Sequence, residues 1–234
     1  THTLISGGKL HVPPEKLSFF YKKLIKHGFE KEESIPIVEK MGHVHPFLVD
    51  IDIKYDQVLT ERQYTTDTLD RIVDFLCTQL SLYLDLDPAL CEVWILEKDK
   101  PYPCQNTRTY QFKDGIHIVF PQILLKKETY KHLIPIFKAE SQIEEIFRQT
   151  CQVVPANTED TLFDGCFTSW QPYGCSKPNE SPYRLTAVYT RAQGTPLRLD
   201  EETFQSHYAD PLEIAKAMSV AYREEENVSY RDTL

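Results

Sequence analysis

The stretch HPFLVDIDIKYD, residues 45–56, has the pattern of a buried β-strand that carries two aspartates, Asp50 and Asp52. Side chains two positions apart in a strand point to the same face of a sheet, so both carboxylates share one side while Val49 and Ile51 lie on the other. Two like charges this close raise each other's pKa unless a cation lies between them. The pair therefore predicts either a divalent-metal site or a strand face open to solvent.

The composition is that of an ordinary globular protein. The chain has 234 residues, 41% of them hydrophobic and 26% charged, which predicts one large domain or two small ones. No apolar run reaches the ~18 residues of a membrane span, and the N-terminus lacks the charged start and apolar core of a signal peptide. We expect a soluble, intracellular protein with no membrane partner.

The net charge and the cysteine content limit the kinds of ligand and metal site that we expect. The net charge of −9, from 26 basic and 35 acidic residues, argues against broad electrostatic wrapping of nucleic acid, so any such contact must be local. The six cysteines stand singly, without a C-x-x-C pair. Reduced thiols are the expectation, and a zinc site assembled from distant cysteines is the alternative.

Hydrophobic periodicity predicts a mixture of helices and strands. Helical spacing of apolar residues predicts helices over residues 13–28, 66–84, 127–151 and 210–226. Runs of apolar residues predict strands over residues 34–41, 45–55, 91–99, 107–112, 116–121, 161–167 and 183–191. Pro135 is expected to break the third helix, and Asp210 to cap the last. Lys113-Asp114-Gly115 is typical of a hairpin turn.

Three further features could carry chemistry. The predicted turn delivers His117 to the start of an apolar strand, and Asp164 stands near the end of another apolar run. The loop YGCSKP, residues 173–178, offers backbone N–H groups, the Ser176 hydroxyl and the Lys177 charge, all of which can bind a phosphate. Taken singly, each has an ordinary structural explanation: a half-buried strand histidine, a surface acid and a surface turn.

In this order the features resemble the archaeo-eukaryotic primase superfamily. With h for a hydrophobic residue, they are the strand hhhDhD, the turn and strand G-x-H-h-h-h-P, the pair h-D, and the loop YG-x-S-K-P. The segments THTLISGGKL, FLVDIDIKY, DGIHIVFP and YGCSKPNESPYRL look most like the primase domains of the primase-helicases of large cytoplasmic-replicating DNA viruses and their relatives. The resemblance runs from Thr1 to about Arg191.

The resemblance implies an α+β fold in which two α/β lobes, one built on a sheet like that of RNA-recognition motifs, face each other across a central cleft. It implies that Asp50, Asp52 and Asp164 are catalytic and bind two divalent ions, Mg²⁺ or Mn²⁺. It also implies that His117 contacts the incoming nucleotide and that Lys177, together with Ser176, reaches the triphosphate. The implied activity is template-dependent synthesis or extension of primers from nucleoside triphosphates on single-stranded DNA during replication.

Two positions depart from the family pattern. Gly115 stands where relatives commonly have a serine, and Gln171 stands where many carry an arginine. A hydroxyl for the phosphates must then come from elsewhere in the chain. Arg108 or Lys113 would supply the missing positive charge, because both lie close in sequence to His117.

The expected domain organisation also follows from the resemblance. We expect a single primase domain over residues 1–234, with a core at about 1–191 and a helical extension at about 210–226. We further expect it to be cut from a longer primase-helicase whose helicase domain follows Leu234. If the protein is viral, it would act in the host cytoplasm or nucleus.

Two other functions stay open at this point. His43 and His45 form a pair similar to that of rolling-circle nicking endonucleases, which use one metal ion and a tyrosine nucleophile, here Tyr64 or Tyr130. The other alternative is a catalytically inactive primase fold that only binds nucleic acid or a helicase partner.

Overall fold

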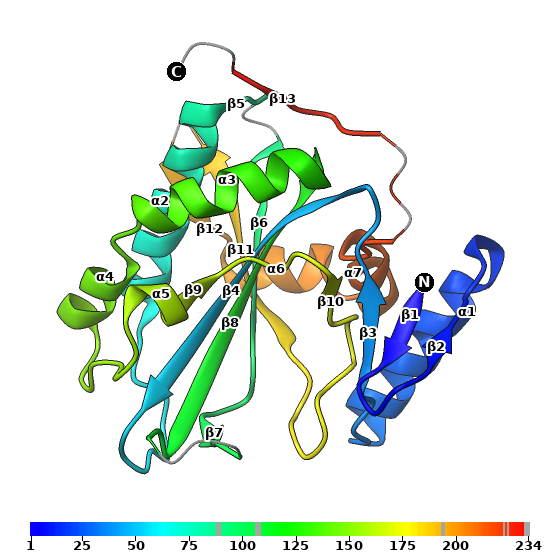
Figure 1. Ribbon diagram of the computed structural model, residues 1–234, viewed down its shortest axis with the longest axis horizontal. Helices are drawn as coiled ribbons and strands as arrows, with labels where there is room; N and C mark the ends of the chain where they lie inside the picture. The colour runs from blue at the N-terminus through cyan, green and yellow to red at the C-terminus, as the bar shows by residue number, and fades with distance from the viewer. Residues whose placement is uncertain (88–89, 106–108, 193–194, 222, 224, 232–234) are drawn as a thin grey trace.

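The computed structural model describes residues 1–87, 90–105, 109–192, 195–221, 223 and 225–231, and within them seven antiparallel strands form the central sheet (Figure 1). The strand order is β12-β11-β6-β8-β4-β9, with β7 paired to β8 outside that path. The strands are β4 (Val44–Tyr55), β6 (Val93–Glu97), β7 (Tyr102–Pro103), β8 (Phe112–Lys126), β9 (Phe163–Asp164), β11 (Arg184–Ala192) and β12 (Thr195–Arg198).

A smaller sheet lies beside the central one, toward the right of Figure 1. Its order is β10-β3-β1-β2, formed by β1 (His2–Leu4), β2 (Lys9–Leu10), β3 (Ile37–Lys40) and β10 (Ser169–Trp170). Two further short strands, β5 (Leu84–Asp85) and β13 (Ser229–Tyr230), pair with each other. Segments far apart in the sequence therefore meet in the smaller sheet, because β10 joins strands from the N-terminus.

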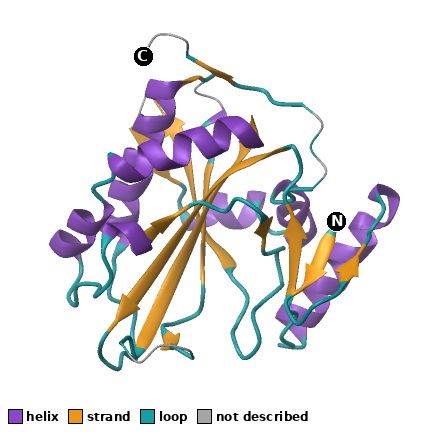
Figure 2. Ribbon diagram, in the orientation of Figure 1, coloured by secondary structure: helices purple, strands orange, loops and turns teal. Residues whose placement is uncertain are grey.

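The helices flank the sheets on both sides (Figure 2). They are α1 (Pro14–Ile25), which runs into the single π-helical turn η1 (Lys26–Glu30), α2 (Thr66–Tyr83), α3 (Lys127–Ala139), α4 (Ile143–Thr150), α5 (Glu159–Leu162), α6 (Glu201–His207) and α7 (Pro211–Ala217). No helix in the described part of the chain is both long and apolar enough to cross a membrane. The mixed α+β class that the sequence predicts is confirmed.

The two faces of β4 bury their side chains in two separate hydrophobic clusters. Val49, Ile51 and Ile53 pack with residues of α2, α3 and α4 on one face. Leu48 packs on the other face with residues of α1, α7 and the neighbouring strands. Each fully buried Ile side chain stabilises the fold by about 1.5–3 kcal/mol, so this alternation strongly favours one orientation of β4. Asp50 and Asp52 accordingly lie on the face of Leu48.

The predicted turn at residues 113–115 is wrong, because β8 runs straight through it. Asp52 and Lys54 of β4 pair there with Gly115 and Lys113. Asp114 between them is fully buried, and its carboxylate accepts hydrogen bonds from the Gly115 N–H at 2.9 Å and from Arg62 Nε at 3.0 Å. Arg62 neutralises the buried Asp114 and so allows this Asp-Gly pair to lie inside the strand. The hairpin prediction assumed that the Asp-Gly pair is exposed to solvent.

Two predicted helix boundaries are also wrong. Pro135 lies inside α3, and the chain breaks only after Ala139. The ring removes one helix hydrogen bond, but Leu133, Ile134 and Phe137 around it are buried against the sheet, and that burial keeps the helix continuous.

The last helix ends at Ala217, well short of residue 226. The Val220 N–H donates to the Glu39 carboxylate at 2.7 Å, and the Val220 carbonyl accepts from Gly42 N–H at 2.7 Å. These bonds draw the chain along the end of β3 and out of the helix. Asp210 does cap the helix start, where its side chain accepts from Leu212 N–H at 2.8 Å.

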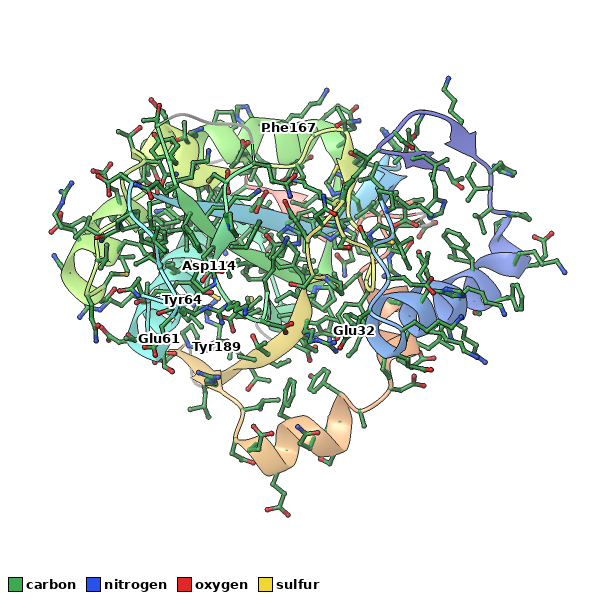
Figure 3. The ribbon with its side chains drawn as sticks, turned by 90° about the horizontal axis from the view of Figure 1, so that it is seen from below. Glu32, Glu61, Tyr64, Asp114, Phe167 and Tyr189 are labelled. Carbon is green, nitrogen blue, oxygen red and sulfur yellow. The ribbon has the colours of Figure 1, made fainter. Side chains whose placement is uncertain are left out.

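Arg62 neutralises two buried carboxylates and so holds β6 and β8 together. Its Nη1 lies 2.8 Å from Glu97 and its Nε 3.0 Å from Asp114; Asp114 and the neighbouring Tyr64 are labelled in Figure 3. Burial raises the pKa of Asp114 even though the Arg62 charge opposes the shift. Loss of the guanidinium would therefore leave uncompensated buried acids.

We expect Arg62→Ala to lower the free energy of unfolding by about 3–5 kcal/mol, the cost of breaking a buried ion pair. Urea denaturation at pH 7.5 measures the loss. Arg71→Ala is the matched control, because Arg71 pairs with Asp67 at 3.1 Å on the exposed face of α2 and should cost less than about 0.5 kcal/mol. Equal losses in the two variants would contradict this role of Arg62.

Candidate active site

Asp50 lies between His117 and Asp164 in the central sheet. It stands directly opposite His117 on β8 and directly opposite Asp164 on β9. Residues that face each other across antiparallel strands share one face, and Asp52, two positions along β4, shares it too. His117 Nε2 is 3.7 Å from Asp50 Oδ1. The structure thus brings together the four side chains that the sequence singles out from three separate motifs.

A pocket of about 230 Å³ opens on this face, between the central sheet, the smaller sheet and the loop after β10. Asp164 is exposed and stands beside Asp50 at the margin. The residues that line the pocket are Ile5, Val38, Asp50, Asp52, Tyr102, Lys113, His117, Cys166, Ser169, Trp170, Gln171, Lys177, Glu180 and Tyr183.

The Asp50 carboxyl group carries the clearest electrostatic perturbation in the pocket. Burial raises its pKa to about 7, and the charges of Asp52 and Asp164 add to the rise, while those of Lys177 and Lys113 oppose it. About a third of the side chain still touches the open space of the pocket (33%), so a ligand can reach a group that the protein otherwise surrounds. The carboxylate is short of positive charge, which favours binding of a cation.

The acids have the donor set of a hard divalent cation. Lys54 Nζ lies 3.0 Å from one Asp52 oxygen, and the Gly165 N–H donates at 2.8 Å to one Asp164 oxygen, which leaves each carboxylate a second oxygen. No three His, Cys, Asp or Glu side chains of the described residues gather tightly enough to enclose a metal ion by themselves. Mg²⁺ commonly needs only one or two carboxylates, because water and substrate phosphates complete its shell, so these residues fit it.

His117 is held between two aromatic rings. Tyr183 stacks on its imidazole with ring centroids 3.6 Å apart and planes at 17°, and Trp170 lies on it at 4.3 Å and 39°. Burial, followed by the charges of Lys98 and Lys177, holds the pKa of His117 well below its usual range. The imidazole is therefore neutral near pH 7. Neither aromatic partner of His117 was predicted from the sequence.

Two lysines line the pocket, and Glu180 forms ion pairs with one of them and with a third lysine nearby. Lys177 lines the pocket, and Lys113 Nζ lies 3.2 Å from a Glu180 oxygen. Lys98, buried just beyond β6, forms an ion pair with the other Glu180 oxygen. Burial lowers the pKa of Lys98. Burial would raise the pKa of Glu180, but its hydrogen bonds and ion pairs with the two lysines outweigh that and lower it.

Lys98, Glu180 and Tyr183 were missed because each gains its importance from long-range contacts. In the sequence, Lys98 lies near the end of the strand predicted over residues 91–99, and Glu180 belongs to a polar loop. A signal was available for Tyr183, because the segment that carries the resemblance runs through it.

One predicted phosphate ligand, Ser176, does not line the pocket, and another, Arg108, cannot be placed relative to it. The Ser176 N–H donates to Ile35 carbonyl at 3.1 Å and its hydroxyl lies 3.4 Å from that of Ser34, so the side chain is buried away from the lining residues. Arg108 lies outside the described residues. The loop that carries Ser176 passes close to η1, where a Cβ on Gly28 would lie 1.9 Å from Gly174 carbonyl oxygen.

Gln171 and Trp170 line the pocket, and each carries a buried N–H donor. Gln171 stands at the position where relatives carry arginine. Its Nε2 and the Trp170 Nε1 are both buried and have no hydrogen-bond partner among the described residues. Buried N–H groups usually find a partner, so these two unpaired donors are unusual features of residues that line the pocket. The missing arginine is replaced at this position by neutral donors.

The residues of the alternative nicking-endonuclease site do not assemble. His43 is 68% exposed, whereas His45 is fully buried with its Nδ1 2.8 Å from a backbone carbonyl. The Tyr64 hydroxyl donates to a carboxylate of β6 at 2.7 Å, and the Tyr130 hydroxyl donates to a backbone carbonyl of β4 at 2.7 Å. The Tyr130 ring does pack on that of His45, with centroids 4.8 Å apart, but both tyrosine hydroxyls are already hydrogen-bonded, so neither is a free nucleophile.

Comparison with known proteins agrees with the arrangement of these motifs. Residues 1–189 match the family model described as "C962R protein N-terminal AEP domain", in which AEP denotes archaeo-eukaryotic primase. A protein of Invertebrate iridescent virus 6 with the name "Putative helicase 184R" is 25% identical over 192 residues, which cover 74% of this chain and 19% of that protein. The chain thus spans about a fifth of the length of this relative.

The raised pKa of Asp50 predicts a pH-dependent cost to stability. Its folded-state pKa of about 7 exceeds the ordinary 3.8, so the cost is absent below the ordinary value and fully present above pH 7. Asp50→Asn should therefore raise Tm at pH 8 by at least about 2–4 °C, the shift produced by 1 kcal/mol in a domain of this size.

Differential scanning calorimetry of the metal-free protein at pH 8 and pH 4 measures the effect, and the gain should shrink at the lower pH. Asp56→Asn, which removes an exposed carboxylate just beyond β4, is the control and should leave Tm unchanged. An Asp50→Asn protein that melts no higher than the unmodified chain at pH 8 would show that Asp50 carries no such cost.

Proposed function

Because the chain belongs to the archaeo-eukaryotic primase family of the C962R type, we propose that it is a nucleotidyltransferase that makes or extends primers from nucleoside triphosphates on a single-stranded DNA template. The observation that carries the proposal is the meeting of Asp50, Asp52 and Asp164 with His117 and two pocket lysines on one sheet face. Primer synthesis requires acids to hold metal ions, cations to receive a triphosphate, and a nucleotide contact, and this face supplies all three.

The three carboxylates are proposed to hold Mg²⁺ or Mn²⁺, as two ions when substrate is present. Bound there, the ions would lower the pKa of the primer 3′-hydroxyl and neutralise charge on the triphosphate. Asp50 lies centrally, with Asp164 opposite it and Asp52 two residues along the same strand. Its high pKa supports the assignment, because a cation would relieve the repulsion that raises it.

His117 and the lysines are proposed to bind the nucleotide. Neutral His117, fixed between Tyr183 and Trp170, would make one directed hydrogen bond to the nucleotide. Lys177 and Lys113 line the same pocket and would form charge-assisted hydrogen bonds with the phosphates, where negative charge gathers as pyrophosphate leaves. His117 is already fixed by its two aromatic partners, whereas Lys113 would have to exchange Glu180 for the triphosphate.

The proposal extends to the architecture and the partner of the domain. We take the central sheet and the smaller sheet with α1 as the two lobes of the family fold, with the pocket in the cleft between them. The match to part of a much longer protein named as a helicase supports a linked helicase as partner, which would supply single-stranded template. The whole of residues 1–234 is then one primase domain.

Asp50→Ala and Asp52→Ala should each abolish metal-dependent incorporation, with a loss of at least about 10³-fold, as expected when a major transition-state contact is removed. The assay uses single-stranded template, labelled ribo- and deoxyribonucleotides, and Mg²⁺ or Mn²⁺, with and without primer. Asp56→Ala, which removes an exposed carboxylate just beyond the same strand, should retain full activity.

A second measurement on the same variants separates metal binding from chemistry. Mn²⁺ should raise the Tm of the unmodified protein and of Asp56→Ala but not that of Asp50→Ala. Full incorporation by either pocket variant would remove the central claim. Saturable nucleotide binding by the unmodified chain without any incorporation would instead favour the inactive, nucleic-acid-binding alternative.

Lys113→Ala and Lys177→Ala should each raise KM for nucleoside triphosphate by about tenfold, equivalent to one charge-assisted hydrogen bond of about 1.4 kcal/mol, with a smaller change in kcat. Steady-state primer extension at fixed template measures both constants. The control is Lys131→Ala on the exposed side of α3. An unchanged KM in both pocket variants would show that the triphosphate binds elsewhere.

A further inference from the structure

The hydroxyl group of Tyr183 occupies the space that a side chain at position 115 would fill. A Cβ built on Gly115 would lie 2.2 Å from the Tyr183 hydroxyl oxygen and 3.3 Å from its Cζ. No real Cβ approaches an oxygen this closely, so only glycine fits while the tyrosine is in place. Gly115 pairs with Asp52 across β4 and β8. The hydroxyl therefore lies on the same sheet face as the acids that are proposed to bind metal ions.

The surroundings of this hydroxyl combine lysines with the carboxylates that are proposed to hold metal ions. Tyr183 lines the pocket together with Lys113 and Lys177, and Lys98 Nζ lies 5.1 Å from the centre of its ring. Among the described residues, the Tyr183 hydroxyl makes no hydrogen bond within the protein. Burial first, and then the charge of Asp50, raises the pKa of Tyr183 well above its usual range. At neutral pH the group thus remains a hydrogen-bond donor, in a pocket lined by two lysines and three carboxylates, of which the proposed function assigns Asp50 and Asp52 to metal ions.

We propose that the Tyr183 hydroxyl donates a hydrogen bond to a phosphate oxygen of the bound nucleoside triphosphate, in place of a side chain at position 115. The proposal rests on the proposed function for the identity of its ligand, and it assigns to Tyr183 a direct contact in addition to its stacking on His117. The ring fixes the hydroxyl, because movement of the ring away from Gly115 would break that stack. A base or sugar contact is less compatible with a site between lysines and metal-binding acids.

Four variants separate the hydroxyl from the ring. Tyr183→Phe removes the hydroxyl and keeps the stack on His117. Gly115→Ser restores a hydroxyl from β8 but clashes with the tyrosine. In the double variant Gly115→Ser/Tyr183→Phe, the serine Cβ lies 3.3 Å from the phenyl Cζ, a tight contact that a small ring shift relieves, and 3.6 Å from the Ile51 carbonyl oxygen, an ordinary contact. Tyr189→Phe is the matched control, because Tyr189 lies on β11 in the cluster on the opposite face (labelled in Figure 3).

Binding is measured by isothermal titration calorimetry with two probes, a nucleoside triphosphate and inorganic tripolyphosphate, in the presence of Mg²⁺ and without template. Tyr183→Phe should weaken both probes by about tenfold, equivalent to about 1.4 kcal/mol. Gly115→Ser should weaken both further, because the clash displaces Tyr183. The double variant should return to within about threefold of the unmodified protein. Tyr189→Phe should bind both probes normally, and thermal melting verifies that each variant folds.

The results distinguish the hydroxyl contact from the enzymatic proposal. Normal binding of both probes by Tyr183→Phe would overturn the contact, as would a loss confined to the nucleoside triphosphate, which would place the hydroxyl at the sugar or base. Failure of the double variant to recover affinity would also count against it. If the unmodified chain binds both probes with this pattern but incorporates no nucleotide, the contact stands and the proposed function fails. If the unmodified chain binds neither probe, both fail.

Discussion

The register between β4 and β8 is the constraint on which the whole site depends. Ile51 and Ile53 are held in the cluster under α2, α3 and α4, so Asp50 and Asp52 must face the opposite way. A slip by one residue would drive both carboxylates into that cluster, at a cost of several kcal/mol for each buried charge. Packing of the hydrophobic face of β4 therefore determines the direction in which Asp50 and Asp52 point. The pocket carboxylates are held in place by side chains on the opposite side of the sheet.

The site also concentrates charge that the rest of the fold does not neutralise. Asp114, on the opposite face, has Arg62 as its counter-ion, whereas the pocket acids have only the partial compensation of Lys54 and more distant lysines. Proteins commonly accept such a local cost where activity needs an unsatisfied group. The contrast between the two faces separates acids that support the fold from acids that are available to a ligand.

Periodicity alone predicted the elements that pack on the sheet. Residues 45–55 and 66–84 correspond closely to β4 and α2, because their apolar spacing reflects burial directly. The shared face of Asp50 and Asp52 also followed from strand geometry. Their meeting with His117 and Asp164 could be expected only from the order of motifs that the chain shares with a family, since no local pattern brings distant strands together.

The parts that could not be predicted depend on partners distant in the sequence. Asp114-Gly115 has the sequence pattern of a turn, and only the ion pair of Asp114 with Arg62 explains why it lies in a strand. Gly115 stands where relatives commonly have a serine, and only the position of the Tyr183 hydroxyl explains the glycine. The buried Lys98 and the displaced Ser176 are of the same kind. In each case the residue type is ambiguous, and a contact across the fold decides its role.

Glu180 gives the pocket a property that a count of its lysines would not suggest. Its two oxygens bind Lys98 and Lys113, so a carboxylate already serves as the anion of the pocket. A triphosphate that binds here would displace the Glu180 carboxylate from the lysines. Only a lysine outside these ion pairs, such as Lys177, would release a bound counter-ion into solution. Nucleotide affinity should then fall less steeply with ionic strength than it would if three unpaired lysines bound the triphosphate. The Glu180 carboxylate would also keep small inorganic anions from binding to the lysines.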